Sequence, residues 1–387
     1  MFLKTITKAT ILLFFGILIL SGYYQPGRIQ YSHPPTLQLP VDTVVFHIVD
    51  FNDDIANDTL IQYLSQEGYP ISYTRHMRTG VCFDNKCRPL DVTLRWNVTG
   101  RYLGFELPEK EFLSKYDHEP FTEAEYQRLH AILTDSLSAL KNFHYNEIVP
   151  KADSSYQKVD AVSGATSANV LDNVVEGAAF TTYKLWHLVY GPAQRRVEAL
   201  TRQQITPAFV QLILNSSHPS DKIWALNHIK GFIVPTSALQ KSVLGYINGK
   251  DYNLMERALH SITAADLQSA SLQGTLAQKL LATNYSTQKL LIGKLSEAPA
   301  LNEKARLVLA KNLGSFSGQL ISDILDLLLR QHSIDAEICR PVSDLLLIEN
   351  PFISKKGYLF LTQANSQDPL VKKRLAEYRA KNNIFEN

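Results

Sequence analysis

The feature that most constrains the fold is a change of residue pattern near Pro192. From there to the C-terminus, apolar side chains recur at the spacing of one helix face, and no strand pattern interrupts them. One such run contains Leu254, Met255, Ala258, Leu259 and Ile262. Polar residues that favour helix starts recur along this half, at Ser220-Asp221, Asp251, Ser286-Thr287 and Asn302. The pattern predicts an all-α domain over residues 192–387.

Helices of about 10–15 residues joined by short polar turns are typical of stacked helix pairs. This half of the chain resembles proteins built from HEAT-type repeats, and a compact helical bundle is the alternative. Because stacked pairs present extended faces to other proteins, we expect a protein partner on this half.

Residues 41–191 carry mixed signals, which predict an α+β domain. The apolar run Val44–Val49 predicts a buried strand. Residues 92–97 and 101–107 predict a hairpin around Val98-Thr99-Gly100. Farther on, Thr122 and Glu125 have the spacing of a capping box, which predicts a helix start. Phe121 and Tyr126 have the spacing of a hydrophobic staple, and Leu129, Ile132 and Leu133 continue one face of this helix.

The first residues indicate export. Lys4 and Lys8 precede an apolar run from Ala9 to Leu20, and the next charge is Arg28. A basic start followed by a short apolar run is typical of a secretory signal. We therefore expect residues 1–24 to be a signal peptide or an uncleaved membrane anchor. Residues 25–40, which are rich in proline, are the expected linker to the first domain.

Composition excludes several classes of protein. The chain has 39 Lys and Arg against 37 Asp and Glu, so it lacks the basic excess of nucleic-acid binders. The 11 histidines show no metal-ligand spacing, so no metal site is expected. The sequence has no P-loop, no nucleophile elbow and no G-x-G-x-x-G fingerprint, so nothing indicates that the chain itself binds NAD(P)H.

Two of the three cysteines form a candidate disulfide. Cys82 and Cys87 bracket Asp84-Asn85, a turn-forming pair between two strand-like stretches. In an oxidising compartment a structural bridge across this hairpin is expected, and a redox-active pair is the alternative. Cys339 lies in a helical stretch, where we expect it to be a small buried apolar residue.

The most informative stretch is residues 160–166, Asp-Ala-Val-Ser-Gly-Ala-Thr. A strand-like run, Val159–Val162, leads into a turn at Ser163-Gly164. A helix is expected next, with one apolar face made by Val170, Leu171, Val174, Val175, Ala178 and Ala179. A glycine turn that opens a helix favours phosphate binding, because backbone N–H groups and the helix dipole point at the ligand. The simpler alternative is that Thr166 or Ser167 only caps the helix.

These residues resemble a known family. The order Asp160-Ala161-Val162-Ser163-Gly164-Ala165-Thr166 is similar to the D-x-x-[S/T]-G-A-T motif of covalent FMN-binding domains, which occur in the sodium-translocating NADH:quinone reductase and the Rnf complex. The resemblance covers the motif and the helix after it, and extends loosely over residues 41–190. It implies that Thr166 is joined to the FMN phosphate by a phosphoester bond. It also implies that an exported flavin transferase makes this bond with FAD as donor.

The resemblance also implies roles for the neighbours of Thr166. The backbone of Ser163, Gly164 and Ala165 is expected to contact the phosphate. Asp160 takes part in the transferase reaction or holds the turn, and Ser167 adds a second hydroxyl at the helix start. Aromatic candidates beside the flavin ring are Trp96, Tyr102, Phe105, Tyr183 and Trp186, with core packing as the alternative. Arg88, Arg95 and Arg101 are candidates to stabilise a reduced flavin, with a surface ion-pair role as the alternative.

Three functions compete at this point. The expected one is an extracytoplasmic electron-transfer flavoprotein with covalent FMN, a carrier or subunit rather than a stand-alone enzyme, that exchanges electrons with a membrane-bound redox partner. The second is an exported flavoenzyme that reduces a small substrate, and the third is a helical-repeat adaptor without a cofactor. No catalytic residue is assigned. We expect the protein in the bacterial periplasm or cell envelope, held at the inner membrane by its N-terminal segment.

Overall fold

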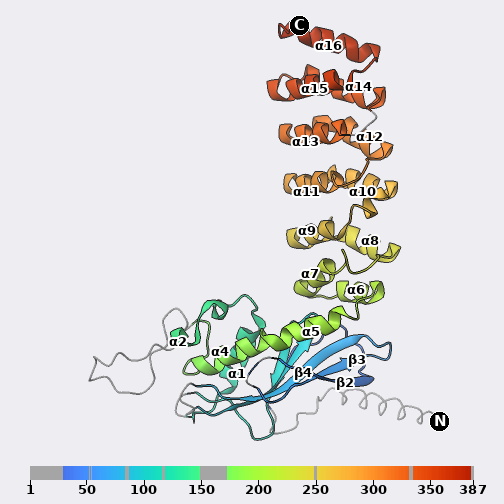
Figure 1. Cartoon of the computed structure of the whole chain (residues 1–387). Helices are drawn as coiled ribbons and strands as arrows, with labels where there is room; N and C mark the ends of the chain where they lie inside the picture. Colours follow the sequence, from blue (N-terminus) through green and yellow to red (C-terminus); the bar gives the residue numbers. More distant parts are fainter. Residues whose placement is uncertain are drawn as a thin grey trace, which may run out of the picture. The chain divides into compact units, whose positions relative to one another are not determined.

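The computed structural model describes residues 29–51, 53, 55–82, 87–115, 118–148, 172–247, 251–330 and 334–384. The chain divides into two compact units, Met1–Gln203 and Gln204–Asn387. In its described residues the first unit is α+β, with one antiparallel sheet and a few helices, and the second consists of helices alone (Figure 1). The expected fold class, α+β followed by all-α, is confirmed at this level.

One six-stranded sheet forms the frame of the first unit. Its strands lie in the order β1-β6-β5-β4-β3-β2, and every neighbouring pair is antiparallel. The strands are β1 (Gln30–Ser32), β2 (Thr43–Ile48), β3 (Thr59–Leu64), β4 (Pro70–Thr79), β5 (Leu90–Asn97) and β6 (Tyr102–Glu106). From β2 to β6, consecutive strands pair with each other, so each connection is the loop of an antiparallel hairpin.

The predicted hairpin is confirmed as β5 and β6. Gly100 has a φ of +77° in the turn between them, a conformation that glycine adopts without strain. Gly104 on β6 is needed for a different reason. A Cβ atom there would collide with the carbonyl oxygen of Tyr31 on β1, so only glycine lets the first strand pair closely.

The predicted buried strand at Val44–Val49 is wrong in its burial. Among the described residues, β2 lies at the edge of the sheet and pairs only with β3. Val44, Phe46 and Ile48 point to one side of the strand and are 42%, 65% and 78% exposed. A continuous apolar run is typical of a strand buried on both faces, but sheet position decides burial, and this strand is the last one in the order.

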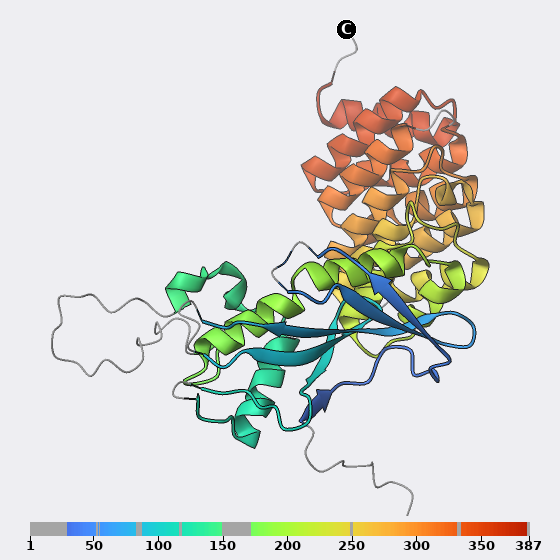
Figure 2. The same cartoon turned by 60° about the horizontal axis from the view of Figure 1, so that its bottom comes forward.

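The helices of the first unit are α1 (Glu123–Thr134), the short helices η2 (Ala139–Asn142) and α2 (Tyr145–Ile148), α4 (Ala179–Val189) and α5 (Pro192–Arg202) (Figures 1 and 2). Helix α1 packs on β6 and α5 on β4, whereas η2 and α2 pack on α4. The predicted capping box is confirmed at α1, where Glu125 N–H donates to Thr122 Oγ1 and Thr122 N–H donates to Glu125 Oε2. The staple residues are also in contact, because the rings of Phe121 and Tyr126 lie 5.3 Å apart.

The second unit is a stack of helix pairs. Its helices are α6 (Pro207–Leu214), α7 (Pro219–Asn227), α8 (Ser237–Tyr246), α9 (Tyr252–Ser261), η3 (Asp266–Gln268), α10 (Ala270–Leu280), α11 (Tyr285–Leu295), α12 (Glu303–Lys311), η4 (Leu313–Ser315), α13 (Gly318–Leu329), α14 (Ala336–Asp344), η5 (Leu345–Leu347), α15 (Pro351–Ala364) and α16 (Pro369–Lys381). Helices α7, α9, α11, α13 and α15 contact one another in order and form one row. The even-numbered helices form the other row (Figure 1).

Polar side chains cap most of these helices, as the sequence pattern predicts. Asp251 and Asn302 accept hydrogen bonds from the first turns of α9 and α12. The start of α11 lies earlier than expected, at the cap Asn284, and α7 begins after His218, with Pro219 at its first position. Proline is favoured there because the first helical N–H has no partner within the helix.

Cys339 is buried in α14, as expected.

Two expected boundaries differ from those of the structure. The strand β1 lies within residues 25–40, so part of the expected linker belongs to the sheet. The division between units follows Gln203 rather than residue 191, because α5 packs on β4 within the first unit.

Within the described ranges, none of the helices has the length and apolar character needed to cross a bilayer. Residues 1–24, the expected signal or anchor, lie outside those ranges.

Candidate functional site

The candidate flavin motif, residues 160–166, falls in the first unit between Ile148 and Asp172. The chain is described up to Ile148 and again from Asp172. The candidate cofactor residues Asp160, Ser163, Gly164, Ala165, Thr166 and Ser167 lie outside the described residues. The structure therefore describes the two flanks of the motif and the helices that hold them.

Both flanks are anchored in the core of the first unit. Ile148, at the end of α2, is fully buried, and α2 packs against α4. On the returning side, the backbone carbonyl of Asp172 accepts a hydrogen bond from the Arg128 guanidinium on α1. Val174 and Val175 follow, and both are buried. The two ends of the connection are thus held by the packing of α1, α2 and α4.

The helix predicted after the motif does not extend through the described residues 172–178. Residues 172–178 form turns, and α4 starts at Ala179, so Val174 and Val175 are buried without being helical. Thr182 explains this. Its hydroxyl accepts from the Val175 N–H at 3.1 Å and donates to the Ala178 carbonyl at 2.9 Å. Gly177, with a φ of +72°, allows the turn that this pair of hydrogen bonds closes.

Helix α4 also holds the segment that leads into the motif. Three of its side chains and that of its C-cap residue, Tyr190, make four hydrogen bonds to backbone carbonyls of residues 133–143. Tyr190 bonds to Leu133, Trp186 to Asp135, His187 to Leu140 and Tyr183 to Phe143, at 2.8–3.2 Å. One helix therefore organises the chain on both sides of residues 149–171.

Most of the aromatic candidates belong to the core. Trp96 is fully buried, and its indole N–H donates to the carbonyl of Val189 at 2.9 Å. Tyr102, Phe105 and Trp186 are buried as well. Tyr183 alone among the five is only partly buried, next to the ring of His187 at 4.1 Å. Core packing thus accounts for four candidates and leaves Tyr183 accessible on α4.

Tyr183 and His187 have shifted pKa values because of where they lie. Burial raises the pKa of the Tyr183 hydroxyl, and the nearby Glu147 carboxylate adds to the effect. Burial lowers the pKa of His187, against a smaller opposite effect of its hydrogen bond to Leu140. Both shifts favour the neutral side chains, so this part of the α4 surface is an uncharged aromatic pair at neutral pH.

The candidate arginines are dispersed. Arg88 forms an ion pair with Glu111 at 2.6 Å and stacks over the ring of Phe112. Arg101 lies within 3.4 Å of the Thr36 hydroxyl. Arg95 lines a hollow on the sheet, together with Tyr63, Thr74 and Glu106. The structure does not bring the three together.

A buried arginine that the sequence analysis did not single out is central to the first unit. Arg75 on β4 is 1% exposed and forms a two-pronged ion pair with Asp53, at 2.7 and 3.1 Å. It also lies over the ring of Phe51. Burial raises the pKa of Asp53, but the hydrogen bonds and charge of Arg75, with a contribution from Lys184 on α4, leave it below its ordinary value. No spacing rule connects an aspartate in a loop to an arginine 22 residues later.

Cys82 and Cys87 are joined by a disulfide, with their Cα atoms 5.5 Å apart. Strands β4 and β5, which flank the pair, form an antiparallel hairpin, and both cysteines pack against the core of the first unit. Residues 83–86, with the expected Asp84-Asn85 turn, lie outside the described residues. The bridge thus closes the tip of this hairpin.

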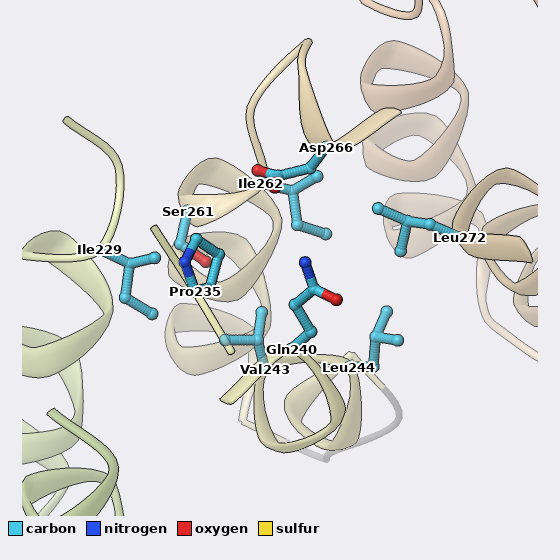
Figure 3. A pocket seen from close by; sticks show the side chains of 9 residues that line it. All are labelled: Ile229, Pro235, Gln240, Val243, Leu244, Ser261, Ile262, Asp266 and Leu272. Atoms are coloured by element: carbon cyan, nitrogen blue, oxygen red, sulfur yellow. The ribbon is translucent and has the colours of Figure 1, made fainter. Parts of the chain in front are cut away.

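The second unit contains a small, mostly apolar pocket (Figure 3). It lies between α8, α9 and α10 and is lined by Ile229, Pro235, Gln240, Val243, Leu244, Ser261, Ile262, Asp266 and Leu272. The Gln240 amide points into the middle of this set (Figure 3).

In the part of the chain that the structure describes, no three His, Cys, Asp or Glu side chains are grouped to hold a metal ion.

Neither a protein-family model nor a curated protein sequence matches this chain. The candidate motif at residues 160–166 is therefore the feature of this chain that points most directly to a function.

Proposed function

We propose that this protein is an extracytoplasmic electron-transfer flavoprotein that carries FMN covalently on Thr166. The observation that carries the proposal is the sequence Asp-Ala-Val-Ser-Gly-Ala-Thr at residues 160–166. It lies in the α+β unit, in a connection whose flanks at Ile148 and Asp172 are held by α1, α2 and α4. An anchored connection suits a covalent carrier, because it presents the cofactor while the core stays intact.

The attachment has a simple chemical balance. The Thr166 hydroxyl attacks the FMN phosphorus of FAD, a new O–P bond forms, the bond to AMP breaks, and the hydroxyl proton leaves with AMP. A flavin transferase supplies the catalysis for this step. The backbone N–H groups of Ser163, Gly164 and Ala165 then hold the phosphate. Asp160 serves the transferase reaction or the turn, and Ser167 lies beside the attachment point.

The bound flavin supplies one- and two-electron redox chemistry, and the protein supplies its position and surroundings. Covalent attachment keeps the flavin on an exported protein, where a dissociated cofactor would be diluted away. In this proposal residues 1–24 hold the chain at the inner membrane, in the periplasm or cell envelope. The electrons come from a membrane-bound redox partner.

The HEAT-like helical unit has a separate role in this proposal. Its two rows of stacked helices form long faces of the kind that solenoids use to bind other proteins. This architecture also favours a second candidate function, an exported helical-repeat adaptor without a cofactor. The two candidates differ in one measurable property, which is the covalent flavin.

The test is the mass of the denatured chain after co-expression of the exported protein with a flavin transferase. We expect a gain equal to FMN minus water. Thr166→Ala abolishes the gain, whereas the matched control Ser167→Ala retains it. An unmodified wild-type chain, with the transferase shown to act on a control protein, overturns the flavoprotein proposal and favours the adaptor.

A further inference from the structure

A row of paired residues crosses the sheet on one of its faces. In register order the row consists of Phe46 on β2, Ile61 on β3, Thr74 on β4, Arg95 on β5 and Gly104 on β6. Residues directly opposite each other in antiparallel strands share a face, so these side chains lie on the same side. Their strand neighbours Tyr73 and Leu94 point to the other side and belong to the core cluster. The row therefore lies on the face away from the core of the first unit.

The row changes from apolar to cationic along its length. Phe46 is 65% exposed, and Ile61 beside it is partly buried. Tyr63, two residues after Ile61 on the same face, extends this apolar part, and its hydroxyl lies 3.2 Å from the Thr74 hydroxyl. Beyond Thr74 the next residue of the row is Arg95. This face of the sheet thus carries an apolar strip that leads to a positive charge.

Arg95 lies in a polar hollow of this face. The hollow is also lined by Tyr63, Thr74 and Thr93. Among the described residues, the partly buried Arg95 side chain has neither an ion pair nor a hydrogen bond, and Glu106, which lines the same hollow, forms no ion pair with it. Taking a charge out of water costs free energy, which an opposite charge offsets. An arginine in this position therefore favours binding of an anion.

The hollow supplies hydrogen-bond donors for such an anion. The Arg95 guanidinium has five N–H groups in a planar fork that matches the two oxygens of a carboxylate. Of the Tyr63 and Thr74 hydroxyls only one donates to the other, so the second hydroxyl hydrogen is left for a ligand. The Thr93 hydroxyl lies on the same face, because Thr93 and Arg95 are two residues apart on β5.

We propose that this face binds a molecule of the fatty-acid type, with one carboxylate head and an unbranched apolar tail. The carboxylate pairs with Arg95 and accepts hydrogen bonds from the hydroxyls of the hollow, and the tail lies over Ile61 and Phe46. Because neighbouring strands are about 4.8 Å apart, the tail spans roughly 14 Å from Arg95 to Phe46, three strands away. This inference is independent of the flavin on Thr166.

The charge of the site favours a carboxylate over a phosphate monoester. A phosphate monoester carries about two negative charges at neutral pH, and Arg95 compensates only one of them. The Glu106 carboxylate, which lines the same hollow, repels the second charge. An uncharged alcohol with the same tail leaves Arg95 without a counter-ion, so it also binds less well than the carboxylate.

Calorimetric titration of the full chain tests the proposal with four probes, each used below the concentration at which it forms micelles. They are decanoate, acetate, decanol and decyl phosphate. We expect decanoate to bind at least about tenfold more tightly than acetate, because its tail covers apolar surface on Phe46 and Ile61. Decanol and decyl phosphate are expected to bind at least about threefold more weakly than decanoate.

Two variants separate the head of the ligand from its tail. Arg95→Gln removes the charge and is expected to weaken the binding of both decanoate and acetate at least about tenfold. Phe46→Thr removes an exposed ring, so decanoate binds about threefold to tenfold more weakly and acetate binds as before. The matched control is Arg78→Gln, at a 76% exposed arginine on β4, which leaves both affinities unchanged.

Chemical modification of the wild-type chain locates the ligand. Phenylglyoxal reacts with accessible arginines, and peptide masses after digestion report the reaction of each one. In the free chain we expect Arg78 to react fast, Arg75, which is 1% exposed, to react slowly, and Arg95 to react at an intermediate rate. Saturating decanoate suppresses the reaction of Arg95 and leaves that of Arg78 unchanged.

Three outcomes overturn the proposal. The first is that decanol or decyl phosphate binds as tightly as decanoate, which means that Arg95 does not select the head of the ligand. The second is binding of decanoate without protection of Arg95, which places the ligand elsewhere. The third is that Arg95 reacts as slowly as Arg75 in the free chain, which means that the chain itself covers the hollow.

Discussion

The hydroxyl of Tyr73, on β4, lies 2.9 Å from the hydroxyl of Thr201, on α5, across 128 residues of sequence. Gln62 donates to the same tyrosine oxygen at 2.9 Å, and its carbonyl oxygen lies 2.8 Å from His47 Nε2. Tyr73 and Thr201 are completely buried. A continuous line of polar side chains thus connects the edge strand to α5 through the core, and every buried member has a partner.

Removing the Tyr73 hydroxyl is expected to destabilise the first unit. Tyr73→Phe leaves the buried Gln62 amide and Thr201 hydroxyl without this partner, which costs about 1–3 kcal/mol. The matched control is Tyr63→Phe, because the Tyr63 hydroxyl bonds Thr74 at 3.2 Å from a half-buried position. Urea unfolding measures both, and a larger loss for Tyr63→Phe would contradict the assignment.

Thr182 is expected to hold the chain where it returns from the flavin motif. Thr182→Val keeps the shape of the side chain and removes two hydrogen bonds at a fully buried site, at a cost of about 1–2 kcal/mol. Thr181→Val is the control, since its hydroxyl has only a long contact of 3.5 Å to the Ser114 carbonyl. Equal losses in thermal unfolding would show that Thr182 has no special role.

His130 predicts a loss of stability in acid. Burial, together with the neighbouring His33, lowers the pKa of His130 from 6.5 to about 4. The unfolded chain therefore takes up a proton first, so stability is complete above pH 6.5 and falls as the pH drops from 6.5 through 4. Because the ring is only half-buried, we expect a loss of about 1–2 kcal/mol.

The pH dependence of unfolding in urea checks this. His130→Gln is expected to flatten the curve between pH 6.5 and about 4. His144→Gln, at an exposed position, is expected to leave it unchanged. An unaltered curve in the His130 variant would assign the acid sensitivity to other groups.

The disulfide is expected to contribute modestly to stability. Cys82 and Cys87 are five residues apart, and closing so short a loop stabilises the fold by about 2 kcal/mol in the chain-entropy model. The double variant Cys82→Ser/Cys87→Ser is therefore expected to unfold at lower denaturant concentration. Its stability is unaffected by reductant, whereas that of the wild type falls to a similar level. A wild type insensitive to reductant would refute this.

Local patterns predicted local structure well. The capping box at Thr122, the hairpin between β5 and β6 and the caps Asp251 and Asn302 depend on residues a few positions apart, and all are present. The predicted helix over residues 174–178 failed because the Thr182 hydroxyl, in the tertiary structure, competes with helical hydrogen bonding there. Helix periodicity alone contains no information on such a contact.

The candidate site shows the same division. The candidate motif at residues 160–166 is visible in the sequence, because the proposed phosphoester needs a hydroxyl at one position and close backbone approach to a phosphate needs glycine and small residues. The flanking residues that hold this connection, among them Arg128, come from elements distant in sequence. The Asp53–Arg75 pair was likewise not predictable, because its partners are brought together only when the sheet forms.

The sequence by itself determined the fold class, with strands and helices before helices alone, because periodicity and capping are properties of neighbouring residues. It also determined the candidate attachment residue, Thr166. Only the tertiary structure decided which apolar strand lies at the edge of the sheet, since Val44, Phe46 and Ile48 have the composition of a core strand. Burial depends on the order of the strands, and that order results from pairing and packing across the whole unit.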